Sequence, residues 1–204
     1  MLASGKKWYL DGTFKSVPKI FTQLVTFHTK YKSRGWPCVH CLCSSKSTET
    51  YQLMFCELKR TFVNVGLLYR PRSFNVDFEL SMLNAIRSHF PNAIIHGCYF
   101  HYCQAVYRKL AELGLAPAFM GNKAFHIWVK KILACPYLPL ASMDDYFVEY
   151  ILQYMSNDDE LRELSPAIVN FADYLTTQWF ENASVPQAIW NIYDRDDDDR
   201  TNNC

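Results

Sequence analysis

One short stretch, KWYLDGT at residues 7–13, carries most of what the sequence predicts about the fold. Residues 7–10 have the length and apolar character of a buried strand, and Asp11 with Gly12 is typical of a turn. Asp11 is therefore expected at the carboxyl end of a strand. Two more strands are predicted at residues 21–28 and 37–43, which are rich in β-forming residues. The chain should thus open with a three-stranded antiparallel meander.

The apolar pattern changes period after this meander. From Ser47, a suitable N-cap, apolar residues recur at helical spacing as far as Phe62. A brief extended stretch at residues 72–76 then ends in Asp77, and the helix that follows is stopped by Pro91. A second acid is therefore expected at the end of a second strand.

The remaining sequence completes an alternating α/β pattern and then turns helical. Residues 93–96 are predicted to form a fifth strand, and the next helix can end at Gly114. Beyond Pro117 apolar residues recur only at helical spacing, and Ser165 before Pro166 is expected to be the N-cap of one of these helices. The order βββαβαβα predicts an α/β fold: a ribonuclease H-like mixed five-stranded sheet with flanking helices, followed by an all-helical insertion or extension.

Three regions are expected along the chain. Residues 1–116 should form the core that carries both acids, and residues 117–190 the helical insertion or extension. Residues 191–204 are expected to be an acidic, disordered tail, because Asp and Asn displace the apolar pattern there.

Composition narrows the possible classes of protein. The 204 residues are 50% hydrophobic, which is enough for a sizeable core, and the net charge of +1 does not indicate a strongly basic nucleic-acid-binding domain. No signal peptide or membrane-spanning apolar run is found. We therefore expect a soluble intracellular protein that makes no use of a membrane, with its eight cysteines mainly as reduced core thiols.

Asp11 and Asp77 are the candidate catalytic residues. If their strands are neighbours in the sheet, the two carboxylates meet at one edge, where they could hold two divalent ions. Such ions activate a water or a 3′ hydroxyl and stabilise the leaving oxygen of a phosphodiester. An aspartate at a strand end is more often a turn former or a helix cap, so the chemistry depends on the surrounding motifs.

The residues around these acids resemble three ordered signatures of Mutator-like element (MULE) transposases, which belong to the DDE transposase superfamily. The third signature contains Cys98 and His101 in a Cys-x-x-His arrangement. The similar stretches are DGTFKSVP (11–18) with FTQL (21–24), DFE (77–79) with AI (85–86) and FP (90–91), and GCYFH (97–101) with QAV (104–106).

The resemblance implies a DNA transposition function by metal-dependent cleavage and strand transfer. It implies that Asp11 and Asp77 are catalytic and bind Mg²⁺ or Mn²⁺, with two ions in the complete site, and that Cys98 and His101 support them. It also implies DNA as the partner, both transposon ends and target, a nuclear location, and a possible homo-oligomer.

A third acid is expected to be missing from this chain. Residues 190–193 and 200–203 resemble the part of the family that leads to the catalytic glutamate, but the sequence ends at Cys204. We therefore expect an inactive fragment of a DDE catalytic domain. The alternative is a non-catalytic DNA- or protein-binding remnant of a transposase. Glu79 is expected to favour the dipole of the helix it begins rather than to replace the missing ligand.

Cysteine and histidine residues leave two further alternatives. Cys38, Cys41, Cys98 and His101 could form a zinc site. Residues 38 and 41 should point to opposite faces of a regular strand, which argues against zinc and favours buried thiols. A nucleophilic arrangement of Asp11, Cys98 and His101 is the other alternative.

Overall fold

The computed structural model describes residues 1–13, 17–32, 34–153 and 164–195. Two compact units divide these residues, the first containing residues 1–98 and the second residues 99–195. Residues 14–16 of the first signature and residues 196–204 of the expected acidic tail lie outside the described ranges. The expected domain boundaries after residues 116 and 190 stay predictions.

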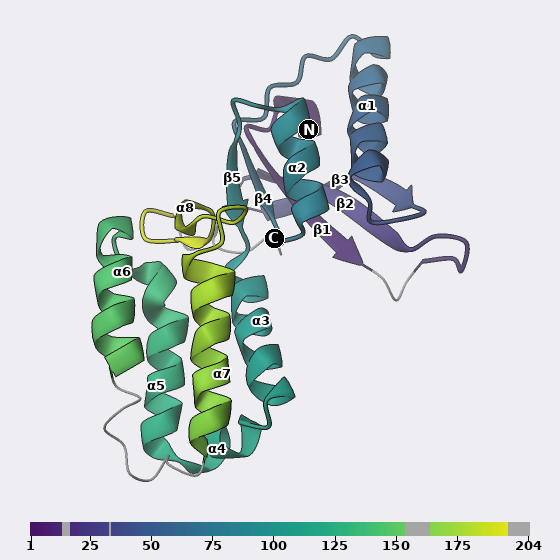
Figure 1. Cartoon of the computed structure of the whole chain (residues 1–204). Helices are drawn as coiled ribbons and strands as arrows, with labels where there is room; N and C mark the ends of the chain where they lie inside the picture. The colour runs from purple at the N-terminus through teal and green to yellow at the C-terminus, as the bar shows by residue number, and fades with distance from the viewer. Residues whose placement is uncertain (14–16, 33, 154–163, 196–204) are drawn as a thin grey trace. The chain divides into compact units, whose positions relative to one another are not determined.

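The first unit is a mixed five-stranded sheet with helices (Figure 1). The sheet has the order β3-β2-β1-β4-β5, in which β1, β2 and β3 pair antiparallel and β1, β4 and β5 pair parallel. The predicted mixed sheet with flanking helices is confirmed. The elements are η1 (Leu2–Ser4), β1 (Lys7–Thr13), β2 (Gln23–Tyr31), β3 (Arg34–Cys43), α1 (Thr48–Asn64), β4 (Ser73–Val76), α2 (Leu80–His89) and β5 (Ile94–Gly97).

The hairpin of β2 and β3 is longer than the sequence predicted. Pairing continues to Tyr31 and Arg34, beyond the expected end of the second strand at residue 28. Lys32, in the turn, adopts a positive φ of 51°, and this left-handed residue allows the chain to reverse tightly. The ladder therefore continues past the last strongly apolar residues.

An aromatic cluster joins one face of this sheet to α1 and α2. Its centre is Trp8, which is fully buried and lies edge-on to Phe27 and Phe74 of neighbouring strands. Phe55 and Phe62 of α1 pack against the same rings. Alternation along β1 therefore turns Trp8 and Leu10 toward the helices and leaves Tyr9 and Asp11 for the opposite face.

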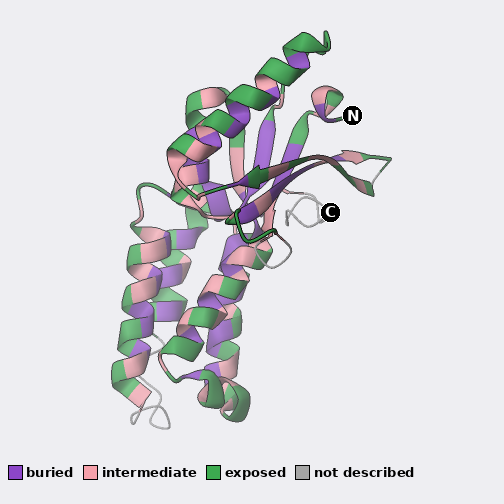
Figure 2. Ribbon diagram, turned by 90° about the vertical axis from the view of Figure 1, so that its right-hand side faces the viewer, coloured by how far each residue is buried: buried purple, intermediate pink, exposed green. Residues whose placement is uncertain are grey.

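The start of α1 follows the sequence prediction. The Ser47 hydroxyl accepts a hydrogen bond from the backbone N–H of Thr50 at 3.2 Å, so Ser47 is the N-cap. The buried residues of α1 lie at helical spacing from Tyr51 to Phe62. Figure 2 shows the same division into a buried and an exposed side along the long helices.

Every regular element among the described residues of the second unit is a helix, in agreement with the helical spacing of apolar residues beyond Pro117. Trp128 and Tyr102 are central to its core, and both donate to backbone carbonyls: Nε1 of Trp128 to Ile151 at 3.0 Å and the Tyr102 hydroxyl to Ile132 at 2.9 Å. The elements are α3 (Tyr99–Glu112), α4 (Ala116–Gly121), α5 (Lys123–Ala134), η2 (Cys135–Tyr137), η3 (Leu140–Ser142), α6 (Met143–Tyr146), η4 (Phe147–Leu152), α7 (Ser165–Leu175), η7 (Thr176–Phe180) and α8 (Gln187–Trp190).

One helix start in this unit differs from the prediction. Ser165 was expected to cap α7, but it is the first residue of the helix, and Leu164 precedes it without a side-chain cap. Leu164 already has helical backbone angles, so the chain begins to turn before Ser165.

Within the described ranges, no helix combines the length and the apolar character needed to cross a bilayer.

Candidate functional site

The parallel pairing of β1 with β4 brings the two candidate acids together. Tyr9 of β1 pairs with Asn75 of β4. Asp11 and Asp77 each lie two residues beyond that pair, at the carboxyl edge of the sheet. Both line one small cavity of about 10 Å³. The strands that lead to the two acids are therefore neighbours in the sheet, as the predicted site requires.

The chemistry of the two acids suits a hard divalent cation. Both residues are half-buried, and carboxylate oxygens are the donors that Mg²⁺ and Mn²⁺ prefer. The cavity has about the volume that one water-sized species requires. In the part of the chain that the structure describes, no three His, Cys, Asp or Glu side chains are grouped so that they could hold a metal ion. The candidate metal ligands among the described residues are therefore the two carboxylates of Asp11 and Asp77.

Polar residues of the meander flank Asp11 on its other side. Thr26 of β2 lies directly opposite Asp11, and its hydroxyl is 3.2 Å from Nδ1 of His40 on β3. His28 lies two residues further along β2. Burial lowers the pKa of His28, and the nearby Asp11 carboxylate partly opposes that shift. A mainly neutral imidazole therefore lies close to this acid.

Glu79 also lines the small cavity, but its carboxylate is directed to other partners. It accepts a hydrogen bond from the Tyr51 hydroxyl at 2.7 Å, and its other oxygen is 3.7 Å from Nζ of Lys46. As the residue before α2, it makes no side-chain hydrogen bond to the helix N-terminus. The expectation that Glu79 serves the helix end is therefore incomplete, because its side chain instead connects α2 to α1.

The third sequence motif begins at the end of β5, beside the residues of β4. Val76 pairs with Gly97, and the backbone N–H of Cys98 donates to the Val76 carbonyl at 2.8 Å. Cys98 is fully buried. Its backbone therefore extends the sheet next to Asp77. His101 lies in the first turn of α3, which belongs to the second unit.

Gly97 is required by a close approach at this edge. A Cβ added to Gly97 would overlap the ring of Phe78, the residue that follows Asp77. Phe78 can therefore lie across β5 only because residue 97 has no side chain.

The strand that carries Cys38 and Cys41 is irregular. The pairing of β3 passes from Val39 opposite Phe27 to Pro37 opposite His28, which leaves Cys38 without a partner residue. Because of this bulge the strand is not regular between residues 38 and 41. The expectation that their side chains point to opposite faces therefore no longer applies. Among the described residues, neither Cys38 nor Cys41 belongs to a group of three or more side chains that could hold a metal ion.

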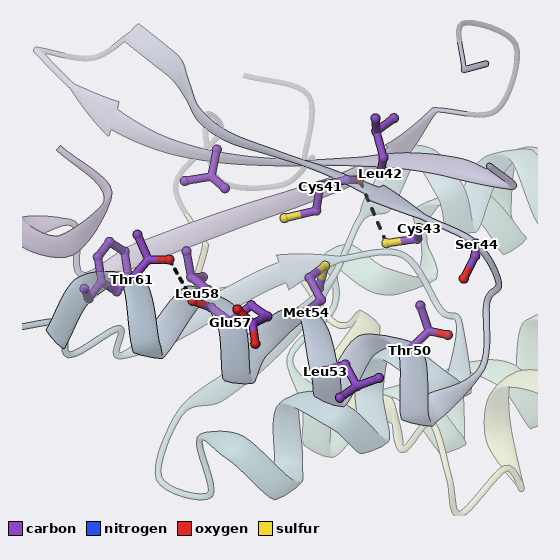
Figure 3. Close-up of a pocket in the computed structure, with 12 residues that line it drawn as sticks. Cys41, Leu42, Cys43, Ser44, Thr50, Leu53, Met54, Glu57, Leu58 and Thr61 are labelled. Carbon is purple, nitrogen blue, oxygen red and sulfur yellow. Dashed lines mark hydrogen bonds between the residues drawn. The ribbon is translucent and has the colours of Figure 1, made fainter. Parts of the chain in front are cut away.

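Cys41 belongs to a different environment, a pocket of about 480 Å³ between β3 and α1 (Figure 3). Cys41 and Cys43 point into this pocket, whereas Leu42 between them points away. Burial raises the pKa of Cys41 to about 11 and also raises the pKa of Cys43, so both are neutral thiols at neutral pH. All described cysteines are free, although Cys56 is exposed rather than a core thiol.

Some residues of this site were not identified from the sequence. In the sequence, Tyr51 is only one apolar position of a predicted helix, and no local pattern gives His28 or His40 a partner. Strand alternation places Thr26 and His28 on one face, which is a usable signal. Their proximity to His40 depends on the hairpin register, which no local pattern reveals.

Comparison with known proteins supports the resemblance seen in the motifs. Residues 7–105 match the family model of the MULE transposase domain. The matched segment contains Asp11, Asp77, Cys98 and His101. No curated protein matches the chain.

Proposed function

We propose that Asp11 and Asp77 are two acids of the metal-dependent DNA-transposing centre of a MULE transposase domain, the family whose model matches residues 7–105. The observation that carries this proposal is the parallel pairing of β1 with β4, because it sets both acids at one sheet edge and in one cavity. The strand order β3-β2-β1-β4-β5, antiparallel on one side of β1 and parallel on the other, supports a ribonuclease H-like fold.

The residues of the site would divide the work between them. Asp11 and Asp77 would supply the negative charge and the oxygen ligands for Mg²⁺ or Mn²⁺. The bound ions would stabilise charge on the attacking and leaving oxygens of a DNA phosphodiester. Thr26 and His28 would form the wall beside Asp11, and the buried Cys98 would support the strand end beside Asp77.

The second candidate function is DNA or protein binding without catalysis. It is favoured by the donor set in the described residues, which contains two grouped acids and no third ligand. If the partner is DNA, this candidate shares its partner and a nuclear location by family with the first, so metal dependence separates the two.

The test is Mn²⁺ binding to the whole chain, measured by isothermal titration calorimetry. Asp11→Asn and Asp77→Asn should each raise the dissociation constant at least about tenfold, which corresponds to about 1.4 kcal/mol for the loss of one charged ligand. Asp173→Asn, which changes an exposed acid in the second unit, should leave the dissociation constant unchanged. Equal Mn²⁺ affinity in all four proteins would exclude this site.

Plasmid DNA then distinguishes the two functions. Nicking that requires Mn²⁺ and both acids supports the transposase centre. Retention of DNA by the wild type and by both Asn variants, without nicking, supports the binding protein.

A further inference from the structure

A chain of hydrogen bonds runs from the meander, through α1, to the start of α2. Nε2 of Gln23, at the first position of β2, donates to the Tyr51 hydroxyl. The Tyr51 hydroxyl donates to Oε1 of Glu79 at 2.7 Å, and Lys46 lies 3.7 Å from Oε2. Gln23 and Tyr51 are each only 1% exposed. Three segments distant in sequence are therefore joined through side chains alone.

The direction of this chain is determined by its ionisation states. Burial, and then the hydrogen bond to Glu79, raise the pKa of Tyr51, so the phenol keeps its proton and donates it. The Tyr51 oxygen can at the same time accept from the amide of Gln23. Glu79 is the charged end, and hydrogen bonds to a charged group are stronger than those between neutral groups.

The chain ends two residues from Asp77 and lines the cavity that both acids share. Gln23, Tyr51 and Glu79 line this cavity together with Asp11 and Asp77. The backbone carbonyl of Glu79 accepts the N–H of Leu83 at 3.0 Å, so Glu79 also begins the hydrogen-bonding of α2. Holding its side chain therefore holds the short connection between β4 and α2, to which Asp77 belongs.

We propose that Tyr51 and Glu79 are positioning residues: through the Gln23–Tyr51–Glu79 chain they hold Asp77 where it can bind a metal ion together with Asp11. This inference rests on the proposed metal-binding role of the two acids and adds to it the device that orients one of them. Glu79 acts here as a hydrogen-bond acceptor and not as a metal ligand.

The two roles for Glu79 predict opposite results for the variant Tyr51→Phe. If Glu79 is an acceptor that positions Asp77, loss of the Tyr51 hydroxyl releases the connection and weakens metal binding. If Glu79 were a ligand, the same variant would free its carboxylate and leave metal binding unchanged or tighter.

The experiment combines Mn²⁺ titration with amide hydrogen exchange of residues 77–83 in the whole chain without metal. Tyr51→Phe should raise the Mn²⁺ dissociation constant and the exchange rate by about tenfold each, the scale of one hydrogen bond to a charged group. Glu79→Ala should do the same. Glu79→Gln, which keeps an acceptor oxygen for Tyr51, should remain within about threefold of the wild type.

Tyr102→Phe is the matched control. It also removes one buried tyrosine hydroxyl, which donates to the Ile132 carbonyl in the second unit. It should lower thermal stability while leaving both the Mn²⁺ affinity and the exchange of residues 77–83 unchanged.

The outcomes separate this inference from the proposed function. Unchanged exchange in Tyr51→Phe, or Mn²⁺ binding as tight as in the wild type, overturns the positioning role. Equal losses in Glu79→Gln and Glu79→Ala overturn it as well, because they indicate a role for the charge itself. If no protein binds Mn²⁺, the proposed metal site is wrong, and the exchange rates still decide whether the chain holds Asp77.

Discussion

The two units of this protein use buried polar side chains in different ways. In the helical unit, ring donors end on backbone carbonyls: Trp128 on Ile151 and Trp190 on Trp179. In the sheet unit, Trp8 likewise donates to the Leu2 carbonyl, but the buried Tyr51 donor ends on the carboxylate of Glu79. A donor that ends on a carbonyl satisfies a buried group and stabilises the fold. A donor that ends on a side chain can also orient that side chain, and this one lines the cavity of the candidate site.

This difference indicates which unit contains the candidate functional site. Both units have dense aromatic cores, so aromatic content alone does not distinguish them. Among the described residues, it is the sheet unit that brings two half-buried acids together, each two residues beyond the last pair of the parallel strands β1 and β4. Substitutions in the helical core should therefore change stability without changing metal affinity, and substitutions at the sheet edge should change both.

The largest effect is expected for Trp128→Ala in the helical unit. Trp128 is 1% exposed, packs against Phe125 and Phe171, and bonds to the Ile151 carbonyl. Its truncation should lower the free energy of unfolding by about 3–5 kcal/mol, measured by urea denaturation. Trp128→Phe keeps a ring in the core and should cost clearly less.

Mn²⁺ affinity of Trp128→Ala tests the comparison directly. Below the temperature at which the variant unfolds, its affinity should match that of the wild type. A parallel loss of affinity and stability would show that the two units do not divide function and stability as stated.

A smaller effect is expected for Gly97→Ala in the sheet unit. The added Cβ overlaps the ring of Phe78, so the ring or the strand must shift, and overpacking of this kind costs about 1–3 kcal/mol. Because Phe78 follows Asp77, Mn²⁺ affinity should fall as well. Both quantities are measured in the same titrations as above.

Gly121→Ala provides the control for this substitution. A Cβ at Gly121, the last residue of α4, meets no atom within 4 Å. This variant should be neutral or more stable by less than about 1 kcal/mol. If Gly97→Ala proves equally harmless, the contact with Phe78 does not constrain the site.

The smallest effect is a pH dependence that belongs to the sheet unit. Burial lowers the pKa of His28 below its ordinary value of 6.5. As the pH falls through 6.5 the unfolded state takes up a proton first, so the free energy of unfolding decreases below that pH. The stability that the protein gains from a neutral His28 is fully present above pH 6.5. It is lost as the pH falls toward the lower pKa of His28 in the folded state.

Urea denaturation between about pH 7.5 and pH 5.5 measures this slope. His28→Gln has no proton to take up in this range and should show a shallower decrease than the wild type. Identical slopes in the two proteins would mean that burial does not lower the pKa of His28 in the folded state.

Local patterns predicted much of the sheet and of the candidate site. Alternating and apolar runs located the strands, and Ser47 located the start of α1, because strand and helix periods are local properties. The turn expected at Asp11 and Gly12 was wrong, because β1 continues to Thr13 and Asp11 pairs with Thr26 of β2. The longer hairpin, the bulge at Cys38 and the start of α7 at Ser165 were not predicted, because they depend on backbone angles at single residues.

The sequence alone predicted the order of the elements and the two candidate acids, and residues 7–105 match the MULE transposase domain model. Only the tertiary structure decided that Asp11 and Asp77 share a cavity, since that follows from the pairing of β1 with β4 across more than one intervening element. The contact of Tyr51 with Glu79 was also decided there. Both contacts join segments that lie side by side only when α1, α2 and the strands are packed together, and no pattern within a single segment encodes the distance between them.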